Sequence, residues 1–268
     1  MSFANIVVDA SPNSGVRRTL EAARDISAEF GSKLTVASYA WPRTSLLRDA
    51  IGSNIMSVEW QTQKMEEALE KTRGIYEEVM QGSEVDSDWC SGIMEPGNIL
   101  RDHLFISDLA ITGTGDAEAF IDSDPTDLAQ RSGAPVLRIG QKAADWRFEQ
   151  VLVAWKDSRE ARHAIHAALP ILQRAKSVLI VGVGDKVTAD RLEAVSRHMR
   201  GHRVAARHLH LSRDTESVCA QLLSRAEVEG CDLIVSGAYS RSRQSERIFG
   251  GVTRGILAAD QMSWLFAH

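Results

Sequence analysis

The segment Asp108-Leu-Ala-Ile-Thr-Gly113 recurs in the second half of the chain as Asp232-Leu-Ile-Val-Ser-Gly237. In both copies an aspartate precedes a short apolar run, and a glycine ends it. Short continuous apolar runs between turn residues are typical of strands that are buried on both faces. The two copies therefore predict the same strand of a parallel sheet in two related domains.

A second pair of segments supports the duplication. Asn5-Ile-Val-Val-Asp-Ala-Ser11 resembles Val151-Leu-Val-Ala-Trp-Lys-Asp-Ser158, with Ser11 opposite Ser158. Elsewhere β-branched runs alternate with helix-like segments, which predicts parallel strands joined by crossover helices. The expected strands, five in each half, are 5–8, 33–39, 85–89, 109–112, 136–139, 151–155, 177–183, 204–210, 233–236 and 262–267.

A repeat of this length indicates a domain duplication, with a polar boundary near residues 141–150. The predicted fold class is α/β: two tandem doubly wound five-stranded parallel-sheet domains, at residues 1–142 and 148–268. Asn13-Ser14 is expected to cap a helix that Gly31 ends, and Ser158 is expected to cap the equivalent helix of the second repeat. Further helices are expected at 58–80, 188–200, 217–229 and 252–258. The irregular loop 40–57 is interpreted as a flexible lid.

Composition favours a soluble, cytoplasmic protein. The chain has 268 residues, of which 44% are hydrophobic and 25% charged. No apolar run approaches the ~20 residues that span a bilayer, so no membrane association is expected, and the strand-like start predicts no secretory leader. Three cysteines without a CxxC pair favour a reducing compartment and neither disulfides nor a zinc ribbon.

The net charge of −5 hides an asymmetry between the halves. Residues 1–140 carry 22 acidic and 12 basic side chains, whereas residues 141–268 carry 14 and 19. A phosphate ligand is therefore expected in the second half. The overall balance argues against nucleic-acid binding.

After the expected ninth strand the sequence reads Gly237-Ala-Tyr-Ser240-Arg-Ser-Arg-Gln-Ser-Glu-Arg-Ile-Phe-Gly250-Gly251-Val-Thr-Arg254. This resembles the nucleotide loop of the universal stress protein family: glycine, two residues, glycine, nine residues, glycine, then serine or threonine. Val151-Leu-Val-Ala-Trp-Lys-Asp-Ser-Arg-Glu160 resembles that family's first strand and turn. Gly133-Ala-Pro-Val-Leu-Arg-Ile139 resembles its fifth strand. The resemblance covers essentially the whole chain twice, and the second half matches better.

The resemblance implies a fold of the adenine nucleotide alpha hydrolase type and a stress-response role. It also implies an ATP- or ADP-binding branch, with or without magnesium, and a branch that binds no nucleotide. Domains of the family pair through their fifth strands, so the two halves are expected to form an intrachain pseudo-dimer. Further homodimerisation stays open. The expected partners are an adenine nucleotide and an unidentified protein.

Ligands of open α/β sheets bind at the carboxyl ends of strands, where Gly237 is expected. Gly250 and Gly251 open the expected helix Val252–Ala258, whose first N–H groups can receive phosphate oxygens. Thr253 adds a hydroxyl. The arginines expected to surround the phosphates are Arg241, Arg243, Arg247 and Arg254, of which the first two can form bidentate contacts.

Three positions depart from the family's pattern. Ser240 replaces the second glycine, and its Cβ can crowd the phosphates. Lys156 stands where ATP-binding members carry an acidic or amide residue; either Asp157 takes that role or Lys156 reaches a phosphate. Gly251 replaces the serine or threonine and keeps only the N–H. The alternative is an arginine-rich surface turn that binds nothing.

The first half has the reverse defect. Asp9 stands at the acidic position, but the loop 113–127 carries five acidic residues and no basic one, charges that repel phosphate. No nucleotide is expected there. A calcium site at Asp122, Asp124 and Asp127 is the weaker alternative to a solvated loop, because the cluster lacks EF-hand spacing.

The histidines are interpreted as structural. His163 and His166 are three residues apart and His198 and His202 four, spacings that can share a helix face, but no HExxH signature or neighbouring cysteine accompanies them. Neither a GxSxG elbow nor a Walker A motif is present. No catalytic residue and no protein-bound metal are therefore expected.

Three functions stay open. The leading hypothesis is a non-catalytic stress-response protein with one degenerate ATP/ADP site in its second domain. The second is an interaction module that binds no nucleotide. The third is a slow ATPase, a weak analogy because a fold does not determine an activity.

Overall fold

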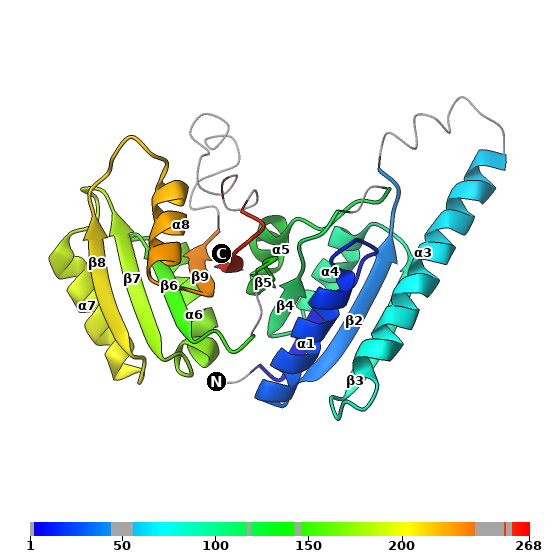
Figure 1. The fold of residues 1–268 in the computed structure, drawn as a ribbon, viewed down its shortest axis with the longest axis horizontal. Coiled ribbons are helices and arrows are strands. Elements are labelled where there is room, and N and C mark those ends of the chain that lie inside the picture. Colours follow the sequence, from blue (N-terminus) through cyan, green and yellow to red (C-terminus); the bar gives the residue numbers. More distant parts are fainter. Residues whose placement is uncertain (1–2, 44–55, 117–118, 143–145, 239–254, 256–258) are drawn as a thin grey trace. The chain divides into compact units, whose positions relative to one another are not determined.

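The computed structural model of the chain describes residues 3–43, 56–116, 119–142, 146–238, 255 and 259–268. The chain divides into two compact units, Phe3–Leu128 and Ala129–His268, which we call the first and the second unit. Each unit is an α/β structure whose sheet is parallel or mostly parallel (Figure 1). No helix among the described residues combines the length and the apolarity of a membrane span.

The first unit has a parallel sheet with the strand order β3-β2-β1-β4. Its strands are β1 (Asn5–Asp9), β2 (Lys33–Ala40), β3 (Ser87–Ile93) and β4 (Leu109–Thr112). Its helices are α1 (Val16–Phe30), α3 (Met56–Met80) and α4 (Pro96–Leu104), while α5 (Pro125–Ser132) crosses into the second unit. Helices α1 and α3 pack together on one face, and α4 packs on the other (Figure 1).

The second unit has the strand order β5-β10-β9-β6-β7-β8. Its strands are β5 (Val136–Arg138), β6 (Gln150–Trp155), β7 (Ser177–Val183), β8 (Ala206–Leu211), β9 (Leu233–Gly237) and β10 (Ser263–Ala267). Its helices are α6 (Arg159–Leu172), α7 (Ala189–Gly201) and α8 (Val218–Val228). Helices α6 and α7 cover one face and α8 covers the other (Figure 1). Only β5, among the described strands, runs antiparallel to its neighbour.

The buried strands explain why the apolar runs are continuous. All four residues of β4 and all five of β10 are buried, so both faces of these strands need apolar side chains. Capping residues begin the helices of the second unit as expected. The hydroxyls of Ser158, Thr188 and Ser217 each accept a hydrogen bond from the backbone N–H three residues on, at 3.1 to 3.2 Å.

The fifth strands of the two repeats pair with each other, as the family resemblance implied. Strand β5 lies antiparallel to β10, with Leu137 opposite Leu265 and Val136 opposite Phe266. Arg138, buried in β5, pairs with Asp260 just before β10. This pairing places β5 in the second unit, so the compact units divide at Leu128. The repeat limits 1–142 and 148–268 stay a prediction about the sequence.

Several local expectations were wrong. Strand β3 begins at Ser87 and not at Val85, and α1 is capped by Gly15 without a side-chain cap. The Asn13 and Ser14 side chains instead accept hydrogen bonds from Gly15 N and Asp116 N. Helices α4 and α5 were not expected. The lid interpretation of loop 40–57 falls mostly on residues 44–55, which lie outside the described residues.

Candidate functional site

The carboxyl ends of β6 and β9 lie side by side in the second unit. Val153 of β6 pairs with Val235 of β9, and each strand ends two residues later, at Trp155 and Gly237. Lys156 follows β6 and is exposed. This edge is where an open α/β sheet binds its ligand. The structure therefore brings Lys156 and Gly237 to one edge, as the sequence predicted.

Gly237 is required by packing, independently of any ligand. A Cβ at this position would lie 2.7 Å from the carbonyl carbon of Glu160 and 2.8 Å from the backbone nitrogen of Ala161. Gly113 has the same role in the first unit, where a Cβ would lie 1.9 Å from Oγ1 of Thr19. Both glycines let the strand end approach the helix that follows the first strand of the repeat. The glycine therefore does not by itself indicate a ligand.

Asp157 is held in place by two neighbours. Its Oδ1 accepts a hydrogen bond from the indole Nε1 of Trp155 at 2.9 Å. The Nε of Arg191, on α7, lies 2.9 and 3.0 Å from its two carboxylate oxygens. These contacts fix the turn after β6 against α7. The same contacts engage the carboxylate of Asp157, which was one of the two alternatives considered for the role of the family's acidic residue.

The remaining residues expected at the nucleotide site are not described by the structure. They are Ser240, Arg241, Arg243, Arg247, Gly250, Gly251, Val252, Thr253 and Arg254, and the expected helix Val252–Ala258 belongs with them. The described part of the edge is thus the frame of the site, formed by β6, β9 and the start of α6.

The equivalent edge of the first unit is organised by Asp9, the last residue of β1. Its side chain is buried and accepts hydrogen bonds from Ser11 N at 2.9 Å, from Ser11 Oγ at 2.6 Å and from Ser123 Oγ. Burial raises the pKa of Asp9, while the bonds from Ser11 and Ser123 oppose that rise. The carboxylate ties the segment 119–123, which we call the strap, to the end of β1.

Arg43 holds the strap from the other side. Its Nε donates to the carbonyl of Phe120 at 2.7 Å, and its Nη2 lies 3.4 Å from Oδ2 of Asp122. The backbone N–H of Ile121 donates to the carbonyl of Trp41 at 2.9 Å. Burial and the charge of Asp9 raise the pKa of Asp122 to about 6, although Arg43 opposes the rise. The strap is therefore an ordered part of this edge.

The loop after β4 is bonded directly to the loop after β1. Ser14 N donates to the carbonyl of Asp116 at 3.2 Å, and Asp116 N donates to Oγ of Ser14 at 2.9 Å. Arg18 Nη2 donates to the carbonyl and to Oγ1 of Thr114 at 3.1 and 2.9 Å. A phosphate group bound between these loops would have to break these contacts.

The aspartates considered for the weaker calcium alternative have other roles. Asp124 Oδ1 accepts hydrogen bonds from the backbone N–H of Thr126 and of Asp127, so it caps α5. Asp122 pairs with Arg43. Within the described residues, no group of three or more histidine, cysteine, aspartate or glutamate side chains has the arrangement of a metal site.

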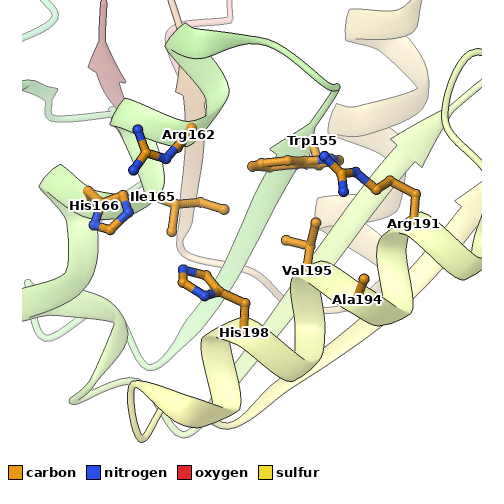
Figure 2. Close-up of a pocket in the computed structure, with 8 residues that line it drawn as sticks. All are labelled: Trp155, Arg162, Ile165, His166, Arg191, Ala194, Val195 and His198. Carbon is orange, nitrogen blue, oxygen red and sulfur yellow. The ribbon is translucent and has the colours of Figure 1, made fainter.

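Sequence reasoning missed a pocket between α6 and α7 (Figure 2). It has a volume of about 190 Å³ and includes His166 and His198, which had been interpreted as structural. The ring centroids of His166 and His198 are 6.1 Å apart, and those of His198 and His202 are 4.8 Å apart. Helical spacing can place His198 and His202 on one face of α7, but only the packing of α6 beside α7 brings His166 close to them.

Comparison with known proteins supports the fold. No protein-family model matches the sequence, and no curated protein matches it. A universal stress protein from Archaeoglobus fulgidus matches 97% of this chain and 95% of its own, with a TM-score of 0.71 and 14% identity. A protein of unknown function from Pseudomonas aeruginosa PAO1 matches 99% and 92%, with a TM-score of 0.60 and 15% identity. A Pseudomonas aeruginosa UCBPP-PA14 protein provisionally assigned to the universal stress proteins matches 99% of this chain and 93% of its own, with a TM-score of 0.59 and 17% identity.

The chain therefore has the fold of tandem universal stress proteins, which confirms the fold that the sequence resemblance predicted. At these identities the likeness is one of fold. Ligand and activity have to be argued from the residues of the site.

Proposed function

We propose that the protein is a non-catalytic stress-response protein of the universal stress protein type. In this proposal the second repeat binds one adenine nucleotide, ATP or ADP, with or without magnesium, and the first repeat serves as a structural or partner-binding half. The observation that carries the proposal is the contrast between the two equivalent sheet edges. In the first unit the chain's own strap and loops are bonded across the edge, whereas in the second the edge leads into the arginine-rich segment 239–254.

The charges of the two edges support this assignment. Asp9, Asp116 and Asp122 surround the edge of the first unit, and their carboxylates would repel a triphosphate. At the second edge Ala154 stands where the first unit has Asp9, and the exposed Lys156 follows the strand. The segment 239–254 adds Arg241, Arg243, Arg247 and Arg254 with a single acidic residue. A nucleotide's phosphates are therefore attracted to one repeat and repelled by the other.

The arrangement around Asp157 favours a second candidate, an interaction module without a nucleotide. Trp155 and Arg191 already engage this carboxylate, so it is a poor substitute for the family's acidic residue. In this case the arginine-rich segment would contact a protein partner. The two candidates differ in one measurable property, which is whether the protein holds a nucleotide.

The test is the nucleotide content of the freshly purified full chain. We expect ATP or ADP to be released on denaturation in an amount close to one per chain. Gly250→Asp, which places a carboxylate at the phosphates, should abolish it. Gly201→Asp is the matched control, because a Cβ at Gly201 meets no atom within 4 Å. It should retain the nucleotide.

Two results would count against the proposal. Absence of nucleotide in the purified protein, together with no binding at millimolar ATP, would favour the interaction module. Multiple-turnover phosphate release that disappears in Gly250→Asp would contradict the non-catalytic part and identify a slow ATPase.

A further inference from the structure

The pocket between α6 and α7 has a largely apolar interior. Ile165 of α6 and Val195 of α7 are buried and face each other across it, and Ala194 lies beside Val195 (Figure 2). Trp155, at the end of β6, closes one end with its indole ring. The volume of about 190 Å³ is below the ~300–1,000 Å³ typical of sites for drug-sized ligands. The pocket therefore fits only a small molecule.

The ionisable residues that line the pocket are all basic. Arg191 is already neutralised by Asp157. Arg162, an exposed residue of α6, forms no hydrogen bond or ion pair with any residue that the structure describes, and it lines the pocket on the side of His166 (Figure 2). His166 and His198 stand at the same end as Arg162. Among the described residues, no carboxylate lines this end of the pocket.

Burial and neighbouring positive charge lower the pKa of His166. The groups that contribute after burial are Arg162, His198, His202 and His163, in that order. The local potential is therefore positive enough to disfavour a further proton. A bound anion would relieve that potential and would replace the missing partner of Arg162.

We infer that this pocket is a binding site for a small aromatic carboxylate. The carboxylate would pair with Arg162, whose planar guanidinium can donate two parallel hydrogen bonds. The ring would lie against Ile165, Val195 and the indole of Trp155, where an aromatic body is favoured over a polar one. The pocket borders the proposed nucleotide edge at Trp155 and Arg191, but Arg162, His166 and His198 take no part in the nucleotide proposal.

The test uses sodium benzoate as the probe and the full chain as the target. The indole N–H of Trp155 lies at the pocket and reports binding through its ¹⁵N-resolved resonance, assigned with Trp155→Phe. We expect benzoate to shift this resonance in a saturable manner. Benzamide, which has nearly the same shape and no charge, should bind at least about tenfold more weakly.

Three variants locate the interaction. Arg162→Gln should weaken benzoate binding at least about tenfold, whereas Arg159→Gln, which removes an exposed arginine of the same helix that pairs with Glu160, should leave it unchanged. Ala194→Leu should block the pocket from an exposed helix position without disturbing the core. Three results would each overturn the inference: benzoate and benzamide bind with equal affinity, the two arginine variants have equal effects, or inorganic phosphate binds as tightly as benzoate.

Discussion

Asp9 and Lys156 lie at the carboxyl ends of β1 and β6, the first strands of the two repeats, and carry opposite charges, although the strand registers place Ala154 and not Lys156 at the position of Asp9. Asp9 is buried and uses both carboxylate oxygens to bind Ser11 and Ser123. Lys156 is exposed beside Asp157, whose carboxylate is directed to Trp155 and Arg191. The first edge thus binds its own chain through a buried carboxylate, whereas the second edge carries an exposed cation.

Asp122 makes the stability of the first unit depend on pH. Its pKa rises from 3.8 to about 6 in the folded protein, so the folded state binds its proton more tightly than the unfolded chain does. Between about pH 4 and 6 the free energy of unfolding therefore contains a contribution that falls as pH rises. Asp122→Asn should remove this contribution, and urea unfolding at pH 4, 5, 6 and 7 would measure it.

The control for this prediction is Asp102→Asn, which changes an exposed carboxylate of α4 that pairs with Arg101. We expect Asp102→Asn to keep the wild-type slope of stability against pH. If Asp122→Asn and the wild type had parallel curves between pH 4 and 6, the burial of Asp122 beside Asp9 would not have the assigned effect.

At the same scale, the positions of some residues could be predicted from the sequence and the contacts of others could not. Lys156 and Gly237 were identified because each stands at a strand end, and the structure brings these ends together. The contacts of Asp157 and the position of Arg162 at the pocket were not predictable, because both depend on how α7 packs beside α6. No local pattern encodes that contact.

At the scale of elements, the alternation of short β-branched runs with helix-like segments predicted all ten strands. Two short helices, α4 and α5, were not predicted. Helix α4 is begun by Glu95, whose carboxylate accepts hydrogen bonds from Gly97 N and Asn98 N, and by Pro96. Helix α5 is begun by Asp124 and Pro125. A proline at the first helical position is a helix-start signal, but both segments are too short for a clear hydrophobic period.

The pairing of β5 with β10 depends on Gly140. A Cβ at Gly140 would lie 2.4 Å from the carbonyl carbon of Met262 and 2.6 Å from the carbonyl oxygen of Gln261. These are backbone atoms that cannot move independently of the strand. Gly140→Ala should therefore lower the free energy of unfolding by about 1–3 kcal/mol, measured by urea denaturation.

Gly201→Ala provides the matched comparison. A Cβ at Gly201, the last residue of α7, meets no atom within 4 Å, and alanine favours the helix by up to about 1 kcal/mol. We expect this variant to be neutral or slightly stabilised. Equal stability of Gly140→Ala and Gly201→Ala would mean that the close approach of residues 140 and 262 does not constrain the strand pair.

At the scale of the whole molecule, the chain contains two repeats that have a common strand order and different charges. The repeats share their strand order and the helix that follows the first strand. They also share a closely packed glycine at the end of the fourth strand, Gly113 in the first repeat and Gly237 in the second. They differ in charge, since residues 1–140 have ten more acidic than basic side chains and residues 141–268 have five more basic than acidic. The fifth strand of the first repeat, β5, pairs antiparallel with the fifth strand of the second, β10.

This asymmetry leads to the central claim, which is one nucleotide per chain. Calorimetric titration of the intact protein with ATP and magnesium tests it directly, because it gives the number of sites together with their affinity. The account predicts a stoichiometry close to one, unchanged in Asp122→Asn and lost in Gly250→Asp. A stoichiometry of two, or binding that survives Gly250→Asp, would show that the first repeat binds nucleotide and would contradict the account.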